Sequence, residues 1–464
     1  MPAPVESQKS YTLGATCDPS MGARVQTDSQ RYLKLIRPAE IYSNIESCLA
    51  TYSPKVQSLR VDRAHGLVSA EDVTSSVDIP ARTASAMDGY VVKWSDLMSA
   101  SPSHPRIFSV GGSIYPDSTE PHFLRSGETY YIATGARLPN GGDTVVRIEE
   151  STPFKNNSIM VRHTIPKGKN VANKGEDVRA GQVVVGKGRV LDPTDIALLI
   201  GVGKTRIKVY RVPRVGLISV GDELEEFTTM LRNRNRQGVN KISNNYLTLI
   251  SGFVRQLGSK AVSLGTCRDN PVEIRRAVLS GSDKCDVIFT IGGSSVGRHD
   301  NVLSALEAIQ GSRTLFHGAR VVPIRPSGVV MLGDKPVVIM PGHAVSALLT
   351  YFVIALPILN IMSGLTPLSR RAKLYAVAKD AIVNERAIDA LSLVKLEVAE
   401  NDSSAASYKA SPLRWGSNLL SNLSEADGFV WLLPHQTIPR NHRVTVQLFA
   451  GSPLAKSKWS FPRD

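Results

Sequence analysis

The feature that most constrains the fold is the stretch of residues 287–300, in which an apolar run leads directly into a glycine-rich loop. Residues 287–291 have the composition of a buried strand, and Asp300 ends the loop before the helical pattern of residues 302–309. The loop itself reads Gly292-Gly293-Ser294-Ser295-Val296-Gly297. A strand, a glycine loop and a helix in this order favour an α/β fold in which backbone N–H groups cradle an anion. By itself the loop is equally compatible with a tight turn that binds nothing.

Two more acidic loops follow predicted strands. Residues 215–220 form an apolar run that ends in Gly221-Asp222-Glu223, and the run at 261–264 precedes Arg268-Asp269. Helical patterns separate these strands: one begins with Ser243 as its expected cap, and another opens at Pro271. Strands that alternate with helices predict a parallel sheet with helices on both faces. Because ligands bind beyond the carboxyl ends of such strands, all three loops are expected at one edge of one sheet.

Composition narrows the function class. The chain has 464 residues and a formal net charge of +14, but its Lys and Arg are spread along the sequence, and the one local run is at residues 232–236. This pattern disfavours nucleic-acid binding and fits an anionic small-molecule substrate. The four cysteines show no metal-ligand spacing, and neither a signal peptide nor an apolar run of membrane-spanning length is recognised. A cytoplasmic enzyme without a membrane or nucleic-acid partner is therefore expected.

Several motifs together resemble one family. Residues 85–90 read Ser-Ala-Met-Asp-Gly-Tyr, which is similar to the signature of the molybdopterin molybdenumtransferases, a family related to the E domain of gephyrin. Residues 132–136, 175–177 and 221–224 resemble further family motifs, as do residues 265–269, the glycine loop and residues 341–347. The order and spacing match from about residue 37 to about residue 450.

The resemblance implies a multidomain α/β plus β architecture. Its central part is a three-layer α/β parallel-sheet domain resembling the molybdopterin-binding fold. The expected parts are a disordered tail at 1–36, an elongated linking domain at 37–83 with 169–210, an inserted β domain at 84–168, the α/β domain at 211–366 and a C-terminal β domain at 367–464.

The resemblance also implies an activity, the insertion of molybdate into adenylylated molybdopterin with Mg²⁺-dependent release of AMP. Both compounds are then the substrates, and the enzyme is a homodimer whose β domain completes the site of the other subunit. The catalytic residues carried over are Asp88, Thr134, Asp177, Glu223, Asp269 and Asp300, of which Glu223, Asp269 and Asp300 are the expected metal ligands. The expected substrate-binding residues are Gly292, Gly293, Ser294, Ser295, Gly297, Arg325 and Ser346.

Two departures from the family pattern leave alternatives open. The usual Lys-Pro-Gly-Lys-Pro stretch is replaced by residues 324–329, where Arg325 keeps the first cation and no cation stands in register with the second, for which Lys335 or Arg320 is a candidate. The usual Pro-Gly-Asn-Pro-Val-Ser reads Pro-Gly-His-Ala-Val-Ser, with His343 at the third position. A tungstate-inserting homologue, a molybdopterin adenylyltransferase and a non-catalytic binding scaffold are the alternatives.

Overall fold

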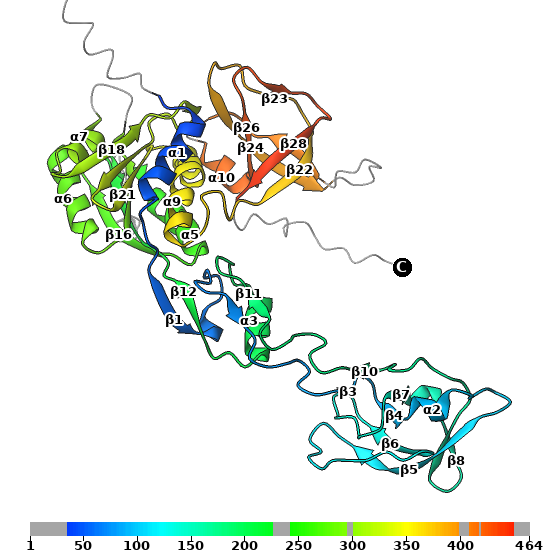
Figure 1. Ribbon diagram of the computed structural model, residues 1–464. Helices are drawn as coiled ribbons and strands as arrows, with labels where there is room; N and C mark the ends of the chain where they lie inside the picture. The colour runs from blue at the N-terminus through cyan, green and yellow to red at the C-terminus, as the bar shows by residue number, and fades with distance from the viewer. Residues whose placement is uncertain (1–34, 226–241, 295–299, 399–407, 417–418, 450–464) are drawn as a thin grey trace, which may run out of the picture. The chain divides into compact units, whose positions relative to one another are not determined.

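The computed structural model describes residues 35–225, 242–294, 300–398, 408–416 and 419–449 (Figure 1). These form two compact units: residues 55–211 make up one, and the segments before and after them make up the other. The predictions for most of the N-terminal tail, for the basic run at 232–236, and for Ser295, Gly297 and His299 lie outside the described residues.

The larger unit is built around a six-stranded sheet in the order β16-β13-β17-β21-β20-β18 (Figure 1). The strands are β13 (Arg214–Val220), β16 (Lys260–Cys267), β17 (Val287–Gly292), β18 (Ser312–His317), β20 (Gly328–Leu332) and β21 (Lys335–Met340). Strands β16, β13, β17 and β21 are parallel, as predicted. Strand β20 is antiparallel to β21 because only Gly333 and Asp334 connect them, and parallel neighbours need a longer crossover.

Helices cover both faces of this sheet. Successive strand residues point to opposite faces, so Leu217 and Phe289 lie in one buried cluster, whereas Ile218 and Ile288 lie in another. Helices α1 (Pro38–Leu49) and α5 (Tyr246–Gln256) contribute to the first cluster. Helices α6 (Pro271–Ser282) and α7 (Asn301–Glu307) contribute to the second. The predicted three-layer α/β architecture is thus confirmed.

Helix α5 begins three residues later than its predicted cap. Ser243 belongs to the short strand β15 (Ile242–Ser243), which pairs in parallel with β14 (Leu224–Glu225), and Asn245 precedes the first turn of the helix. This pairing connects segments on either side of residues 226–241, and local sequence signals do not specify it.

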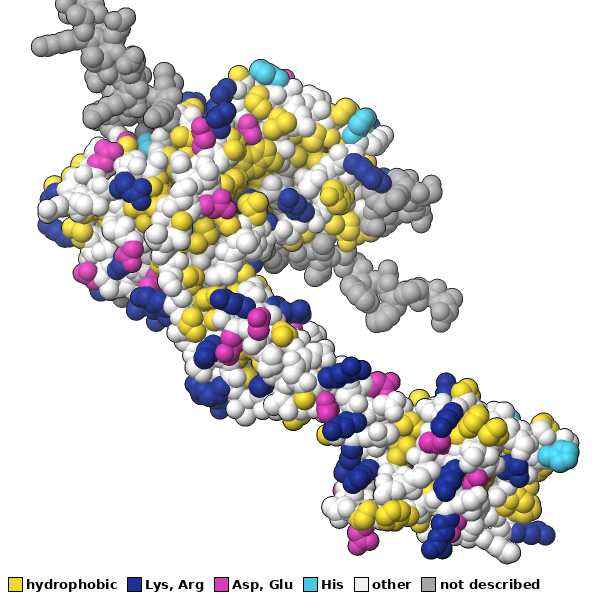
Figure 2. Space-filling model, in the orientation of Figure 1, with side chains coloured by type: hydrophobic (Ala, Val, Ile, Leu, Met, Phe, Trp, Pro, Cys, Tyr) yellow, Lys and Arg dark blue, Asp and Glu magenta, His cyan; other side chains and the backbone are white. Residues whose placement is uncertain are grey.

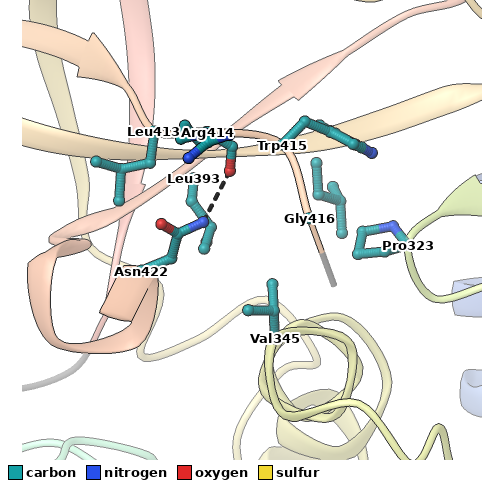
Figure 3. Close-up of a pocket in the computed structure, with 9 residues that line it drawn as sticks. Pro323, Val345, Leu393, Leu413, Arg414, Trp415, Gly416 and Asn422 are labelled. Carbon is teal, nitrogen blue, oxygen red and sulfur yellow. Dashed lines mark hydrogen bonds between the residues drawn. The ribbon is translucent and has the colours of Figure 1, made fainter. Parts of the chain in front are cut away.

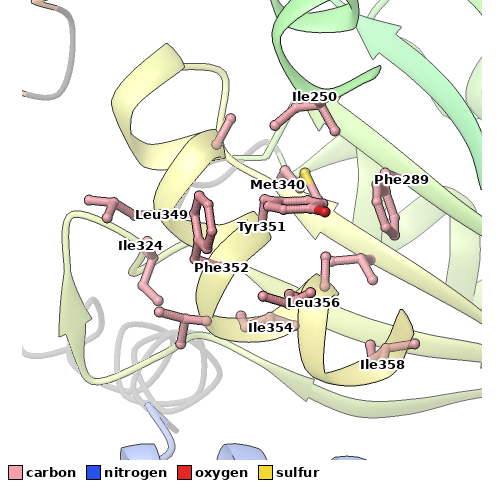
Figure 4. Close-up of a cluster of buried hydrophobic side chains, with 14 of the residues drawn as sticks. Ile250, Phe289, Ile324, Met340, Leu349, Tyr351, Phe352, Ile354, Leu356 and Ile358 are labelled. Carbon is pink, nitrogen blue, oxygen red and sulfur yellow. The ribbon is translucent and has the colours of Figure 1, made fainter. Parts of the chain in front are cut away.

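The core of the larger unit contains one long apolar helical segment, Ala344–Met362 (Figure 4). By length and composition it is long enough to span a membrane, so the sequence-based statement that no such run exists is wrong. However, 94% of the segment is buried inside the protein, which is typical of a core helix. It consists of α8 (Ala344–Thr350), a π-helical turn η4 (Tyr351–Ala355) and α9 (Leu356–Met362).

Pro357 explains the π-helical turn. Proline has no N–H to donate to the carbonyl four residues earlier, and its ring crowds that carbonyl, so the regular α-helical pattern is interrupted. Arg371 supplies donors instead: its Nη2 lies 2.7 Å from the carbonyl oxygen of Phe352 and 3.4 Å from that of Val353. The same guanidinium stacks over the ring of Tyr42 in α1, which ties the helix to its neighbour.

The C-terminal part of the larger unit is a closed β domain. Its main strands follow the order β24-β25-β22-β28-β26, and β26 also pairs with β24, which closes the sheet. The strands are β22 (Lys373–Ala378), β24 (Asp389–Val398), β25 (Tyr408–Pro412), β26 (Gly428–Leu432) and β28 (Arg443–Leu448). Strand β19 (Val321–Val322) pairs with β24, and β23 (Ile382–Val383) pairs with β27 (Thr437–Ile438). Helix α10 (Leu420–Glu425) precedes β26.

The second unit, residues 55–211, has its own cores. Strand β1 (Val56–Arg60) pairs with β12 (Arg206–Tyr210), β2 (Val73–Thr74) with β11 (Val183–Val185), and β3 (Ala84–Ser85) with β10 (Val171–Ala172). Helix α3 (Pro193–Gly201) packs with the first two pairs. A six-stranded sheet follows the order β7-β4-β6-β5-β9-β8. Its strands are β4 (Gly89–Val92), β5 (Arg106–Ile114), β6 (Glu128–Ile132), β7 (Thr144–Arg147), β8 (Thr152–Phe154) and β9 (Ser158–Val161), with the short helix α2 (Trp94–Leu97) alongside.

Candidate functional site

A cavity of about 440 Å³ lies at the carboxyl edge of the α/β sheet. Its lining residues come from the ends of four neighbouring parallel strands and the segments after them, from the start of α5 and from the segment before β20: Val220, Gly221, Glu223, Leu224, Tyr246, Asp269, Gly292, Gly293, Ser294, Pro326, Pro341, Gly342 and His343. The predicted convergence of the three acidic loops at one sheet edge therefore brings Glu223, Asp269 and the start of the glycine loop together. The volume is within the range of small-molecule sites.

Gly292 and Gly293 are required by close backbone packing. Their φ values are +94° and +63°, a region that side chains with a Cβ rarely occupy. A Cβ on Gly292 would lie 2.3 Å from the carbonyl oxygen of Val220, and one on Gly293 would lie 2.5 Å from Cγ1 of Val220. Gly292 and Gly293 therefore pack tightly against β13 and line the cavity.

A bulge in β16 brings Asp269 level with this loop. The register between β13 and β16 shifts between Leu217 and Ser219, and Gly265 on β16 has a φ of +86°. After the bulge Cys267 pairs with Val220, so Asp269 follows directly beyond the sheet edge. Asn301 then holds Asp269, because its Nδ2 lies 2.9 Å from the backbone carbonyl and 3.2 Å from Oδ1 of Asp269.

Glu223 follows the end of β13 by three residues and lines the cavity. Its carboxylate folds over Gly221, where a Cβ would meet both oxygens at 2.8 Å. Burial and the charge of Glu223 raise the pKa of Tyr246 at the start of α5. Tyr246 thus lines the cavity as a neutral hydroxyl near a carboxylate.

Asp300 is engaged differently from the prediction. Its Oδ1 accepts a hydrogen bond from the backbone N–H of Leu303 at 2.9 Å and caps α7. Its Oδ2 lies 2.9 Å from Nε2 of His317, and both side chains are largely buried. Within the described residues neither of these two atoms has a hydrogen bond of good geometry, so the two side chains are in close contact without a well-directed bond. In this structure Asp300 therefore caps α7 and contacts His317.

The predicted metal ligands do not form a preassembled set. Within the described residues, no group of three or more His, Cys, Asp or Glu side chains is arranged to hold a metal ion. Only Glu223 and Asp269 of the three predicted ligands line the cavity. Two carboxylates suffice for Mg²⁺, which is commonly held by one or two carboxylates together with substrate phosphates and water.

Two buried polar atoms near the cavity lack protein partners. Within the described part of the chain, neither Oγ of Ser294 nor Nε of Arg325 has a hydrogen-bond partner. Ser294 lines the cavity directly, and Arg325 precedes the lining residue Pro326. Buried donors without partners are costly unless a ligand satisfies them. Both donors are suited to an anionic group.

The two candidates for a second cation lie elsewhere. Lys335 begins β21 and donates to the carbonyl of Ser282, whereas the cavity is at the other end of that strand, roughly 17 Å away at about 3.3 Å per residue. Arg320 donates to the carbonyl of Ala387 at 3.2 Å. The proline spacing of the family stretch is matched by Pro323 and Pro326, which makes Arg325 the second cation of the pattern rather than the first.

Ser346 does not reach the cavity surface. It lies in the first turn of α8 with only 1% of its surface exposed, and it is not among the lining residues. The prediction that it binds substrate directly is not supported by this position. His343, which was noted only as a departure from the family motif, lines the cavity just before α8. Tyr246 was also missed, since its only local signal is its place at the start of a helix.

The second unit carries Asp88 and Thr134. Oδ1 of Asp88 accepts hydrogen bonds from the backbone N–H of Thr134 at 2.6 Å and from its hydroxyl at 2.8 Å. These bonds hold the pKa of Asp88 below its usual value, so the carboxylate is ionised at neutral pH. Asp177 is exposed, whereas the neighbouring Glu176 accepts a hydrogen bond from the backbone N–H of Asn173 at 2.6 Å and so stabilises a turn.

A second cavity lies where the C-terminal β domain meets α8, lined by residues that include Val345, Leu413 and Trp415 (Figure 3). Its volume is about 20 Å³, which is enough for a single water molecule. It is therefore a packing gap rather than a substrate site. On the face drawn in Figure 2, the described Lys and Arg side chains are spread over both units among acidic and uncharged ones.

Comparisons with known proteins cover both units. A family profile described as MoeA N-terminal region (domain I and II) matches residues 35–203, and one described as probable molybdopterin binding domain matches residues 216–360. The molybdopterin molybdenumtransferase of a Nostoc species is 31% identical over 306 residues, which are 65% of this chain and 68% of the relative. Molybdopterin molybdenumtransferase 2 of Mycobacterium tuberculosis is 30% identical over 65% of this chain and 74% of its own length.

Solved structures agree with this result. A crystal structure of the molybdopterin biosynthesis MoeA protein from Pyrococcus horikoshii superimposes with a TM-score of 0.71 at 26% identity, covering 90% of this chain and 99% of the other. A second structure of that protein gives a TM-score of 0.75 at 24% identity and the same coverage of this chain. The fold, the cavity at the sheet edge and the sequence matches all lead to one conclusion: this chain belongs to the molybdopterin molybdenumtransferase family, and its members are transferases.

Proposed function

We propose that this protein inserts molybdate into adenylylated molybdopterin and releases AMP in a Mg²⁺-dependent step. The observation that carries the proposal is the cavity at the carboxyl edge of the sheet, which combines Gly292, Gly293 and Ser294 with two carboxylates, Glu223 and Asp269. An adenylylated substrate brings a pyrophosphate, and molybdate is a tetrahedral oxyanion. The site therefore has to hold several negative charges at once.

The residues at the cavity would bind different parts of the substrates. The backbone of Gly292 and Gly293 and the hydroxyl of Ser294 offer donors to phosphate oxygens. Arg325 provides a permanent positive charge and an unpartnered Nε for an oxyanion. Glu223 and Asp269 are acceptors, and they would repel phosphate unless a cation lies between them and the substrate. Bound Mg²⁺ would neutralise the bridging phosphate oxygens and polarise the bond that breaks. Ser295 and Gly297, outside the described residues, remain proposed members of the loop.

We further propose that the active form is a cytoplasmic homodimer with a shared site. The proposed residues are divided between the two units of the chain: Asp88, Thr134 and Asp177 belong to one, and the cavity residues belong to the other. A test is co-expression of Asp88→Asn and Asp269→Asn chains with different affinity tags. If sites are shared between subunits, the mixed dimer contains one intact site and recovers activity that neither pure variant has. A mixed dimer as inactive as the pure variants would refute sharing.

Three other functions remain to be separated from this one. Tungstate has the same charge and nearly the same shape as molybdate, and only competition between the two anions at limiting concentration distinguishes them. A molybdopterin adenylyltransferase would instead consume ATP and attach AMP to molybdopterin. A scaffold would do neither.

The experiment uses the purified full-length protein with adenylylated molybdopterin, molybdate and Mg²⁺. We expect AMP release that depends on molybdate and stops when EDTA removes Mg²⁺. Incorporation of AMP from ATP into molybdopterin, without molybdate-dependent release, would support the adenylyltransferase. Binding of the substrate without either reaction would support the scaffold.

A further inference from the structure

Three tyrosines form an aromatic surface beside Asp88 in the six-stranded sheet of the second unit. The ring centres of Tyr90 and Tyr131 are 6.0 Å apart with planes inclined at 77°, and those of Tyr115 and Tyr131 are 6.1 Å apart. Tyr115 is 50% exposed, and Tyr90 and Tyr131 are partly exposed. None of these tyrosines has a role in the cavity described above.

The strand pattern explains why these side chains share a face. Strands β4, β6 and β5 are neighbours (Figure 1), and Tyr90 on β4 lies directly opposite Tyr131 on β6. Asp88 directly precedes β4, and burial together with the charge of nearby Asp88 raises the pKa of Tyr131. Tyr131 pairs with Ser113 on β5, and Tyr115 follows Ser113 by two residues. Cross-strand pairing therefore places a carboxylate next to three phenol rings.

Packing and hydrogen bonds hold the side chains of this surface in place. Tyr90 packs against the buried cluster that contains Val92, Phe108 and Val146. Thr134 holds Oδ1 of Asp88 with two hydrogen bonds. Among the residues that the structure describes, none donates a hydrogen bond to Oδ2. One carboxylate oxygen of Asp88 is thus held in place, and the other can accept a hydrogen bond from a ligand.

The negative charge of Asp88 determines which part of a ligand can bind to the tyrosine surface. An ionised carboxylate beside the electron-rich faces of tyrosines repels phosphates and oxyanions. It favours a planar ring that stacks on an aromatic side chain and has N–H donors along one edge. Within an adenylylated pterin, two rings are available. The 2-amino-4-oxopyrimidine edge of the pterin offers an adjacent amino group and ring N–H, whereas adenine offers one amino group beside a ring acceptor.

We propose that Tyr90, Tyr115 and Tyr131 hold the pterin ring of the substrate, with Asp88 accepting from its 2-amino edge. This inference rests on the proposed function, because it takes the substrate to be an adenylylated pterin. It assigns the pterin ring to the six-stranded sheet of the second unit. Tyr131 is the central member, since it contacts both other tyrosine rings.

The test measures binding of unsubstituted pterin (2-amino-4-oxopteridine) to the full-length protein by quenching of pterin fluorescence. Removing one stacking ring in Tyr131→Ala is expected to weaken binding roughly tenfold, and Tyr131→Phe is expected to retain most of the affinity. Tyr375→Ala is the matched control, because Tyr375 is 72% exposed in the C-terminal β domain. Asp88→Asn is expected to weaken pterin binding, because the amide has only one acceptor oxygen. AMP affinity is expected to be equal in all these proteins.

The outcomes separate this inference from the proposed function, since pterin binding requires no turnover. Unchanged pterin affinity in Tyr131→Ala overturns the tyrosine site even if the wild type releases AMP normally. Weakened pterin binding supports the site even if no molybdate insertion is detected. If Tyr131→Ala sediments as a monomer and binds pterin as the wild type does, the surface is a subunit contact, and the inference is overturned.

Discussion

Replacing Gly293 by alanine tests how tightly the glycine loop packs. The new Cβ would lie 2.5 Å from Cγ1 of Val220, 2.9 Å from Cγ2 of Val302 and 3.1 Å from Oδ1 of Asp269. Two costs add: the φ of +63° is unfavourable for alanine by about 1–2 kcal/mol, and forcing a methyl group into a packed site costs about 1–3 kcal/mol. The expected destabilisation is about 2–5 kcal/mol.

Gly333 provides a matched control. Its φ of +62° is nearly the same, but it lies in the β20–β21 turn with nothing within 4 Å of an added Cβ. Gly333→Ala should therefore show only the backbone cost of about 1–2 kcal/mol. Urea unfolding measures both variants; it is followed by tryptophan fluorescence, to which Trp431 at the main core contributes, in a Trp94→Phe background that removes the signal of the second unit. Gly293→Ala should also lose activity, because Asp269 must shift. Equal destabilisation by the two substitutions would refute the close packing that we describe.

Three further predictions concern single side chains. Arg371→Met should destabilise the protein by about 2 kcal/mol, and by less in a Pro357→Ala background, where a restored N–H can bond to the helix; equal losses in a double-mutant cycle would exclude this role. Arg325→Ala should raise the molybdate concentration for half-maximal insertion roughly tenfold or more, and Arg325→Lys less; coinciding curves would place the oxyanion elsewhere. Burial, with the charges of Glu273 and Asp269, raises the pKa of Cys267 to about 11, so its alkylation should rise with a midpoint near that pH in the folded protein. Because the pKa of Cys267 is higher in the folded than in the unfolded protein, its contribution to the free energy of unfolding is complete below the unfolded pKa of about 8.5. This contribution is lost as pH rises through the folded pKa. An alkylation midpoint in the folded protein equal to the midpoint in urea would contradict this prediction.

Much of the α/β fold was predictable because its strands are buried on both faces and separated by helices. Such strands read as continuous apolar runs, and residues 215–220 and 287–291 were located in this way. The pairing of β20 and β18 was not predicted. Their order depends on a two-residue turn at Gly333 and on contacts between strands, which hydrophobic periodicity does not encode.

The site was predictable only as far as the sheet edge determines it. Parallel strand ends meet at one edge, so Glu223, Asp269 and Gly292 were expected together, and they line one cavity. The contact of Asp300 with His317 depends on packing between a loop and a distant strand end, which no spacing indicates. Likewise, Ser346 lies in the correct helix, but its direction into the core is set by tertiary packing. The tyrosine surface beside Asp88 arises from register across three strands, and the sequence alone shows only separate tyrosines.

The proposed role of the cavity carboxylates in Mg²⁺-dependent transfer can be tested by replacing each of them singly. Molybdate-dependent AMP release is measured for Glu223→Gln, Asp269→Asn and Asp222→Asn, where Asp222 is an exposed neighbour that does not line the cavity. We expect a loss of about a hundredfold or more for each of the first two, a shift of the remaining activity to higher Mg²⁺ concentration, and near wild-type rates for Asp222→Asn. Wild-type rates in Glu223→Gln and Asp269→Asn would contradict the account.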